Sequence, residues 1–224
     1  MFYKIALDGP SGAGKSSLAK RIAKDLGIVY VDTGAMYRTI GLYVTRKGVA
    51  PADEEKVIAL LPEIALSVRF LDGEQHIFLG EEDVGGLIRT PEISMAASRV
   101  SAIPAVRAFL LDTQRNLAKT SSVIMDGRDI GTVIFPDAEV KIFLTASPEA
   151  RARRRTLELA EKGHPTPYEE VLRDIITRDK NDREREIAPA VAAEDAILLD
   201  NSDLDLDGTV AEAIRIIRSR VSEA

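Results

Sequence analysis

The glycine-rich stretch at residues 9–16 constrains the fold of this chain more than any other feature. It reads Gly-Pro-Ser-Gly-Ala-Gly-Lys-Ser and follows directly after the apolar run Lys4–Leu7. Apolar residues then recur every four positions, as on the buried face of an amphipathic helix, at Leu18, Ile22 and Leu26. A strand, a glycine-rich turn and a helix in this order predict the first βα unit of an α/β domain with a parallel sheet.

The same stretch matches the pattern G-x-x-x-x-G-K-[ST], which is typical of phosphate-binding loops. Gly9, Gly12 and Gly14 allow positive φ, so successive backbone N–H groups can converge on phosphate oxygens. The following helix directs its positive end at the same anion, and we expect Lys15 to reach the β- and γ-phosphates while the Ser16 hydroxyl coordinates Mg²⁺. A tight strand–helix turn that binds no nucleotide is the alternative. The expected triphosphate-binding residues are Gly9, Pro10, Ser11, Gly12, Ala13, Gly14, Lys15, Ser16 and Ser17.

Five short apolar runs have the length and β-branched composition of buried parallel strands. Helical patterns separate most of them, which indicates right-handed βαβ units, and 224 residues suit one such domain with insertions. The sequence therefore predicts an α/β fold with a five-stranded parallel sheet flanked by helices, in which ligands bind at the carboxyl ends of the strands. The predicted strands are Lys4–Leu7, Ile28–Val31, Ser122–Met125, Val140–Leu144 and Ala196–Leu199.

A small antiparallel insert interrupts this alternation. The alternating runs Ser67–Leu71 and Gln75–Leu79 flank Asp72-Gly73-Glu74, which predicts a β-hairpin. Helical segments are predicted before it, around Pro51–Ile64, and after it, around Pro91–Ala118.

The stretch Arg151–Glu186 is the second departure. It is charged, poor in apolar residues and predicted to be helical, with a break at Gly163-His164-Pro165, and few core contacts predict a mobile segment. In a chain of net charge −6, its many arginines indicate either a bound polyanion or exposed helices held by salt bridges. These arginines are Arg151, Arg153, Arg154, Arg155, Arg173, Arg178, Arg183 and Arg185.

Composition excludes several classes of protein. Zero cysteines exclude disulfides and thiolate chemistry, and 2 histidines are too few for a His-based metal site. The acidic net charge argues against a general nucleic-acid binder, and no window approaches the roughly 18 apolar residues of a membrane span. The first strand starts too close to Met1 to leave room for a signal peptide, so we expect a cytoplasmic globular protein.

Polar residues after the second predicted strand are the first candidates for a second ligand. The segment Asp32–Arg38 reads Asp-Thr-Gly-Ala-Met-Tyr-Arg. We expect Thr33 to cap the next helix and Tyr37 and Arg38 to lie in its first turns. A capped surface helix with an incidental arginine–carboxylate pair is the alternative.

The third predicted strand is followed by Asp126–Thr132, which reads Asp-Gly-Arg-Asp-Ile-Gly-Thr. Polar residues at the carboxyl end of a central parallel strand belong to the ligand crevice. We expect Asp126 to hold Mg²⁺ through water, and Arg128 to neutralise a phosphate by a bidentate contact.

A third candidate segment is Arg178–Arg185. In a helix, Arg178, Asp182 and Arg185 are spaced i, i+4 and i+7 and share one face. A solvated salt-bridge ladder explains such a face in isolation. Beside a phosphate loop, arginines on a mobile segment are expected to stabilise a transferring phosphoryl group and to exclude water from it.

Together these motifs resemble the bacterial cytidylate kinases, which are P-loop nucleoside-monophosphate kinases acting on CMP and dCMP. The resemblance runs from Ile5 to the last predicted helix and includes the hairpin, which the shorter adenylate-type kinases lack. It implies one kinase domain with a core (about 1–34, 104–150 and 188–224), a monophosphate-binding insert (about 35–103) and a lid (about 151–187). The matching stretches are Asp8–Ser16, Asp32–Arg38, Asp126–Thr132 with Val140–Leu144, and Arg178–Arg185.

The resemblance implies roles for individual residues. Thr33 stands where a serine is more usual in this family, and its hydroxyl preserves the chemistry. The acceptor phosphate is assigned to Arg38 and Arg128, beside Tyr37; the cytosine base to Thr33, Arg107, Asp129 and Arg185; the pentose to Ser98, Arg178 and Asp182. The donor side is assigned to Arg151, which binds ATP, and to Arg154, which is catalytic together with Lys15, Arg128 and Arg178.

The implied reaction is in-line transfer of the ATP γ-phosphoryl group to CMP or dCMP by a monomer that uses Mg²⁺, with no general base, nucleic acid or membrane. Arginines that donate to cytosine N3 and O2, with Asp129 accepting from N4, match the hydrogen-bonding groups of cytosine. Uracil has the opposite polarity at N3 and at position 4, so it does not match them. Another kinase on this fold (for UMP, AMP or shikimate) and a nucleotide-driven switch stay as alternatives. The chain lacks the Asn-Lys-x-Asp-like stretch of a guanine-reading switch.

Overall fold

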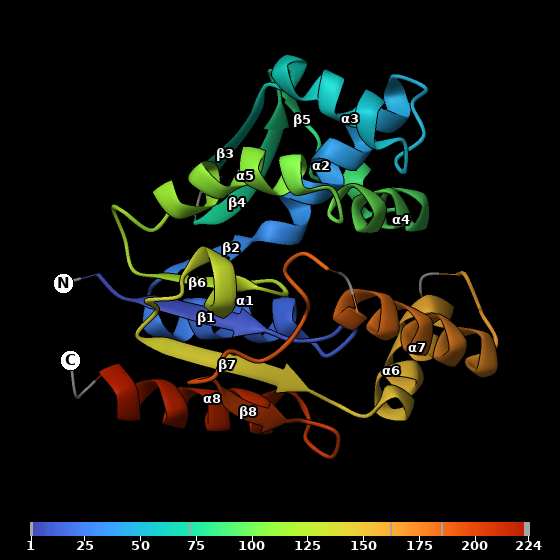
Figure 1. Cartoon of the computed structure of the whole chain (residues 1–224). Coiled ribbons are helices and arrows are strands. Elements are labelled where there is room, and N and C mark those ends of the chain that lie inside the picture. The colour runs from blue at the N-terminus through green and yellow to red at the C-terminus, as the bar shows by residue number, and fades with distance from the viewer. Residues whose placement is uncertain (1, 72, 162, 185, 222–224) are drawn as a thin grey trace. The chain divides into compact units, whose positions relative to one another are not determined.

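The computed structural model describes residues 2–71, 73–161, 163–184 and 186–221, and divides into two compact units (Figure 1). The first unit comprises residues 1–28 and 122–224, and the second comprises residues 29–121. The first contains β1 (Lys4–Asp8), α1 (Lys15–Leu26), β6 (Val123–Asp126), η3 (Ile130–Ile134), β7 (Val140–Thr145), α6 (Pro148–Glu161), α7 (Tyr168–Glu184), β8 (Ile197–Asp200) and α8 (Leu206–Val221). The second contains β2 (Val29–Asp32), α2 (Thr33–Arg46), α3 (Glu54–Leu60), η1 (Leu61–Glu63), β3 (Leu66–Leu71), β4 (Glu74–Leu79), β5 (Glu82–Asp83), η2 (Leu87–Arg89), α4 (Pro91–Val100) and α5 (Pro104–Asn116).

The main sheet has five strands in the order β2-β6-β1-β7-β8. Within the first unit, β1 pairs in parallel with β6 and with β7, and β7 pairs in parallel with β8. In this register Ile5 lies beside Ile124 on one side and Val140 on the other, and all three are buried. The five predicted strands are confirmed, each shifted by no more than one or two residues, because buried parallel strands must be apolar along their whole length.

Helix α1 begins directly after the glycine-rich loop and packs against β1, β6 and α8. Its buried residues include Leu18 and Ile22, which are two of the positions whose four-residue spacing predicted the helix. It ends at Gly27, whose φ of 66° is the left-handed conformation that closes helices, and the Gly27 N–H donates to the Ala23 carbonyl.

Helices α6 and α7 pack against each other beyond the end of the sheet toward which β7 points (Figure 1). They share a small apolar cluster of Ala152, Val171 and Ile175, with Leu159 and Leu172 packed against it. The helical prediction for Arg151–Glu186 is thus confirmed for the residues described. The segment has an apolar core of its own, although few of its residues are apolar.

The second unit contains the predicted hairpin, in which β3 and β4 pair antiparallel with Leu66 opposite Leu79, and β5 extends the sheet. Asp72, in the predicted turn, lies outside the described residues. The helical prediction around Pro91–Ala118 corresponds to two helices, α4 and α5, which meet at 100°. They separate because Ile103 is extended and Pro104 starts a new helix, since proline disfavours helical geometry in the residue before it.

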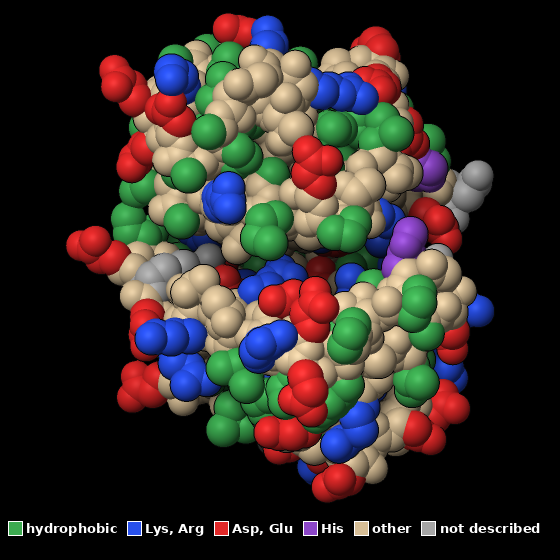
Figure 2. Space-filling model, turned by 90° about the vertical axis from the view of Figure 1, so that its right-hand side faces the viewer, with side chains coloured by type: hydrophobic (Ala, Val, Ile, Leu, Met, Phe, Trp, Pro, Cys, Tyr) green, Lys and Arg blue, Asp and Glu red, His purple; other side chains and the backbone are tan. Residues whose placement is uncertain are grey.

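No single helix in the described ranges is long and apolar enough to span a membrane, although α4 and α5 pass that test of length and composition as a bent pair. Ile93, Val100, Val106 and Leu110 of these two helices are buried inside the protein. Acidic and basic side chains are interspersed over the face of the molecule shown in Figure 2.

Candidate functional site: a phosphate loop and its cationic surroundings

The loop between β1 and α1 has the backbone that the sequence predicted. Gly9, Gly12 and Gly14 have φ of 147°, 76° and 90°. A Cβ on Gly9 would lie 2.0 Å from the Leu144 carbonyl oxygen, so only glycine fits there. Gly14 precedes α1 without a side-chain cap, which leaves the first N–H groups of the helix directed at the loop. This loop geometry is suited to binding an anion.

Lys15 is the buried cation of this loop. It is 6% exposed, and its Nζ donates to the Pro10 carbonyl at 2.7 Å. Burial and the neighbouring charge of Arg128 lower the pKa of Lys15 to about 7, against the opposite effect of Asp126 and Asp8. Burial and Arg128 thus outweigh the neighbouring carboxylates and disfavour the charged form of Lys15, which an anionic ligand would favour.

Ser16 and Asp126 are the two predicted metal ligands, and the structure brings them together. The Ser16 hydroxyl donates to Asp126 Oδ2 at 2.7 Å, and Asp126 is 4% exposed. Two oxygens this close can serve one cation, and oxygen ligands are those that Mg²⁺ prefers. Among the residues described, no group of three His, Cys, Asp or Glu could hold a metal ion. These residues fit Mg²⁺, which keeps several waters and substrate phosphates as ligands.

Arg128 and Asp182 connect the loop after β6 with helix α7. Arg128 Nε donates to Asp182 Oδ2 at 3.0 Å, and both side chains are largely buried, at 23% and 18% exposed. Arg178 lies one turn earlier on α7 and keeps exposed surface. Loss of hydration lowers the pKa of Arg178, and Arg128 lowers it further, whereas Asp182 raises it. The two arginines therefore act electrostatically on each other around a shared carboxylate. Arg185, predicted on the same face, lies outside the described residues.

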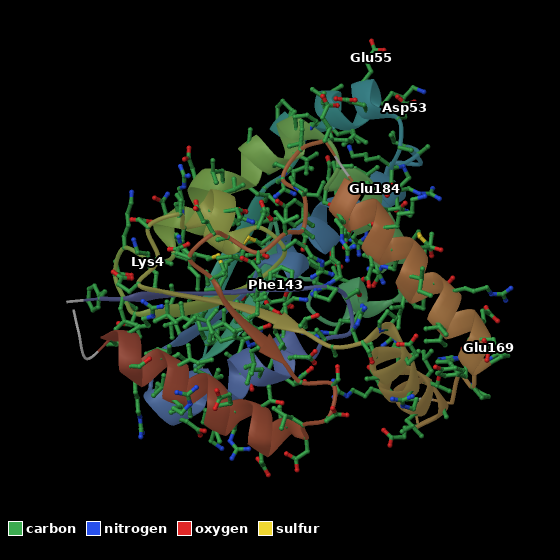
Figure 3. The ribbon with its side chains drawn as sticks, turned by 60° about the horizontal axis from the view of Figure 1, so that its bottom comes forward. Lys4, Asp53, Glu55, Phe143, Glu169 and Glu184 are labelled. Carbon is green, nitrogen blue, oxygen red and sulfur yellow. The ribbon has the colours of Figure 1, made fainter. Side chains whose placement is uncertain are left out.

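Arg151 lies at the start of α6 and is 2% exposed. Its guanidinium donates to both carboxylate oxygens of Asp179 on α7, at 3.0 and 2.5 Å. It also donates to the carbonyls of Ala146 and of Ser11 in the phosphate loop, both at 2.9 Å. Arg151 thus ties α7 to the loop. Figure 3 shows α7 along its whole length, with Glu169 and Glu184 near its two ends.

Arg154 donates to backbone carbonyls of the loop that follows β8. Its Nη2 lies 2.5 Å from the Asn201 carbonyl and 3.2 Å from the Leu204 carbonyl. Asn201 in turn donates from Nδ2 to the carbonyl of Ala13 in the phosphate loop, at 3.1 Å. The sequence analysis did not single out Asn201. Its position, directly after a core strand, is the signal that points to it.

A cavity of about 300 Å³ opens beside the phosphate loop in the first unit. Pro10 lines it together with Thr145 and Asp200, which are the last residues of β7 and β8. Arg151 and Asp179 line it from the helices. It lies at the carboxyl ends of the strands, where ligands of parallel sheets bind.

The second unit holds another group of predicted residues, at the start of α2. The prediction that Thr33 caps this helix is wrong: Asp32 is the N-cap, and its Oδ1 accepts from the Ala35 N–H at 2.8 Å. Thr33 is instead the first helical residue and is buried. Asp32 Oδ2 also accepts from Arg38 Nη2 at 2.7 Å, while Arg38 Nε is buried with no hydrogen-bond partner among the residues that the structure describes. A buried donor without a partner is costly, and an anionic ligand would satisfy it.

Tyr37 and Arg107 come together in the same unit, although seventy residues separate them. The Arg107 guanidinium lies 5.5 Å from the centroid of the Tyr37 ring, and its Nη1 donates to the Ser101 carbonyl at 3.2 Å. Helices α2 and α4 pack against each other, and a Cβ on Gly41 would lie 3.0 Å from the Ala97 nitrogen. Ser98 follows in α4 and is partly buried.

The family model described as "Cytidylate kinase" matches residues 5–219. Curated relatives named cytidylate kinase include that of Caldicellulosiruptor bescii, 48% identical over 95% of this chain and 94% of its own length. Those of Caldanaerobacter subterraneus subsp. tengcongensis (50%, covering 96% and 94%) and Thermosipho melanesiensis (46%, covering 97% and 97%) are similar over the same extent.

Among solved structures, a gluconokinase from Sinorhizobium meliloti 1021 superposes with a TM-score of 0.50 at 16% identity, covering 98% of this chain and 94% of that one. A protein from Eubacterium ventriosum superposes with a TM-score of 0.52 at 13% identity, covering 97% and 99%. At such identities the similarity concerns the fold alone.

Proposed function

Because the chain belongs to the cytidylate kinase family, we propose that it transfers the γ-phosphoryl group of ATP to CMP and dCMP, giving CDP and dCDP. The observation that carries the proposal is the arrangement of Lys15, Arg128 and Arg178. Lys15 is buried in the phosphate loop, and Arg128 lowers the pKa of both other cations. Phosphoryl transfer depends on this kind of positive field more than on covalent help from the protein.

The donor half of the proposal rests on the loop. Backbone N–H groups of Gly9 and Ser11–Ser17 hold the ATP phosphates, and Lys15 bridges the β- and γ-phosphates. Ser16 and Asp126 would hold Mg²⁺, Asp126 through water, and the bound ion would supply positive charge to the phosphates. Arg151 and Arg154 complete the donor half: Arg151 binds ATP and Arg154 is catalytic. Arg151 donates to the Ser11 carbonyl of the phosphate loop and Arg154 to the loop after β8, which fits these roles.

The acceptor half rests on residues carried over from the family. Arg128 and Arg38 bind the acceptor phosphate, and the buried Nε of Arg38, which has no hydrogen-bond partner in the described part of the chain, favours this role. Arg178 and Asp182 contact the pentose, with Ser98. Arg178 also approaches the transferring group. The acceptor phosphate is anionic at neutral pH, so no general base is required, and the attack is in line with the leaving ADP.

Base selection follows from donor and acceptor polarity. Cytosine presents an N4 donor and acceptors at N3 and O2, whereas uracil reverses the polarity at N3 and position 4. We propose that Asp129 accepts from N4 and that Arg107 and Arg185 donate to N3 and O2, beside Thr33. A uracil would leave buried polar groups unmatched, and unmatched buried polar groups discriminate strongly between ligands.

We further propose that the enzyme depends on Mg²⁺ and that it is a monomer in the cytoplasm. We also propose that its kinase domain is divided into core, insert and lid at the bounds that the family implies. The packing of α6 on α7 around their own apolar cluster supports a lid as a separate element.

A coupled assay of ADP formation with ATP and, in turn, CMP, dCMP, UMP, AMP or no acceptor tests the function. We expect rapid ADP formation with CMP and dCMP, and a much lower rate with UMP and AMP. ADP formation that ignores every acceptor would point to a nucleotide-driven switch, and a preference for UMP or AMP would point to another monophosphate kinase. Either result refutes the proposal.

A further inference from the structure

Asp8 is the last residue of β1 and stands directly before the phosphate loop. It is 4% exposed, and each of its carboxylate oxygens accepts a backbone hydrogen bond at 2.8 Å, Oδ1 from Ile130 and Oδ2 from Gly131. These two residues belong to the loop after β6, more than 120 positions further along the chain. One side chain thus links the donor loop to the loop that carries Arg128 and Asp129.

The N–H groups that Asp8 binds have no partner within their own turn. Residues Ile130–Ile134 form a π-helical turn, whose first internal hydrogen bond is from Val133 N to the Asp129 carbonyl, at 2.9 Å. The N-terminal N–H groups of any helix need partners from outside it. Asp129 is the N-cap residue of this turn, yet its side chain makes no cap hydrogen bond. Asp8 caps the turn from another strand, so capping does not engage the Asp129 carboxylate.

Lys141 also packs against this loop. A Cβ on Gly131 would lie 3.2 Å from Lys141 Cδ and 3.4 Å from Asp8 Oδ2, so both side chains closely approach Gly131. Lys141 is itself fixed, because its Nζ donates to the Pro136 carbonyl at 2.7 Å and to both oxygens of Asp195 at 2.8 Å. The turn therefore has little freedom to shift while Asp8 holds it.

Keeping a carboxylate at position 8 has a cost. Burial raises the pKa of Asp8 to about 6, although the N–H groups of Gly131 and Ile130 lower it and Asp129 raises it again. A neutral side chain would avoid this desolvation, but no neutral side chain of this size offers two acceptor oxygens to two N–H groups.

We propose that Asp8 is a positioning residue for acceptor recognition: by capping Ile130 and Gly131 it fixes Asp129 and Arg128 relative to the phosphate loop that begins at Gly9. The inference rests on the proposed function, since it assigns Arg128 and Asp129 to the acceptor. Asp8 does not touch the substrate. It acts through the backbone of the loop, and its loss is expected to affect the choice of base as well as the rate.

The test compares Asp8→Ala, which removes both acceptors, and Asp8→Asn, which keeps one oxygen and turns an amide N–H₂ toward the other backbone donor. Asp53→Ala is the matched control, because Asp53 also accepts from a backbone N–H at a helix start, that of Lys56 at 3.3 Å, but has no assigned part in the site. Steady-state kinetics with CMP, UMP and ATP are measured for each, with thermal denaturation and equilibrium binding of CMP.

We expect Asp8→Ala to raise the KM for CMP about 10-fold or more and to reduce the preference for CMP over UMP by a similar factor, as a misplacement of about 1 Å can do. The KM for ATP should change less than about 3-fold, because the phosphate loop keeps its glycines. Asp8→Asn should lie between wild type and Asp8→Ala, and Asp53→Ala should shift only the melting temperature.

An Asp8→Asn enzyme that melts at a lower temperature but keeps the wild-type CMP affinity and the wild-type preference for CMP over UMP overturns the inference. A purely structural role would lower stability and leave the relative use of CMP and UMP unchanged. If Asp8→Ala does not fold, Asp8→Asn decides the outcome through CMP binding by its folded fraction. A wild-type enzyme that forms no CMP-dependent ADP contradicts the proposed function instead, so the two failures are distinct.

Discussion

Replacing Gly9 by alanine is the sharpest test of how the phosphate loop is built. The new Cβ would lie 2.0 Å from the Leu144 carbonyl oxygen, and contacts under 3.0 Å essentially never occur, so β7 and the loop must separate by at least about 1 Å. The φ of 147° is also unfavourable for any residue with a Cβ.

The chain offers a matched control in Gly48, which has a φ of 69° and would have no atom within 4 Å of an added Cβ. Gly48→Ala incurs only the left-handed backbone penalty, about 1–2 kcal/mol. Gly9→Ala adds an overpacking cost of about 1–3 kcal/mol to a similar penalty. The difference of about 2 kcal/mol corresponds to a melting temperature lower by about 4–8 °C than that of the control.

The assay is thermal denaturation of both variants alongside wild type, with equilibrium binding of ATP at a temperature where all are folded. We expect Gly9→Ala to bind ATP at least about 10-fold more weakly, because its backbone N–H groups no longer converge, and Gly48→Ala to bind as wild type does. Equal melting temperatures and equal ATP affinities for the two variants would refute the reasoning, because the contact with Leu144 would then not constrain the loop.

Three further substitutions test the assigned roles. Lys15→Ala should lower kcat by about 10²–10³-fold, as loss of a charge-stabilising donor does, and near-normal turnover would contradict its contact with phosphate. Asp129→Ala should lower kcat/KM for CMP by about 10²-fold and that for UMP by less than about 3-fold, and equal losses would remove its base-reading role. Asp182→Ala should raise the KM for CMP about 10-fold, as loss of a charged hydrogen bond does, and leave the KM for ATP unchanged in the same assay. A matching rise in the KM for ATP would show that Asp182 acts on the lid as a whole.

The elements that the sequence predicted well are those set by local pattern. Apolar runs such as Val140–Leu144 must be strands because both faces of the sheet are covered, and the glycines of residues 9–16 must adopt positive φ. The hairpin followed from its alternation and its turn residues. The helical segment Pro91–Ala118 divides at Ile103, and this division could also have been predicted, because Pro104 follows directly.

Predictions were wrong or incomplete where two adjacent residues could both cap a helix, or where a side chain had several possible hydrogen-bond partners. Asp32 and Thr33 are both good N-cap residues, and the cap fell to Asp32 because its backbone is still extended, with φ of −88° and ψ of 97°. The family resemblance assigned Arg151 and Arg154 to the donor side, but it did not indicate that both donate to protein carbonyls. Such choices depend on distances between distant segments, which no local pattern contains.

The sequence left two explanations for the arginine-rich segment, exposed salt-bridged helices or a site for a polyanion, and in the structure its acidic residues Asp179 and Asp182 differ in their arginine partners. Asp179 and Asp182 are three residues apart on α7 and so lie on neighbouring positions of one face. Asp179 binds Arg151 through both oxygens, a pair that is largely buried and matched one to one. Asp182 is shared: it accepts from Arg128 and raises the pKa of Arg178, while these two arginines oppose each other. Positive charge therefore exceeds negative charge around Asp182, where two arginines share one carboxylate, and not around Asp179. Lys15 is close to this group, because Arg128 and Asp182 both affect its pKa. Under the proposed function, an anionic ligand bound there would stabilise all three cations.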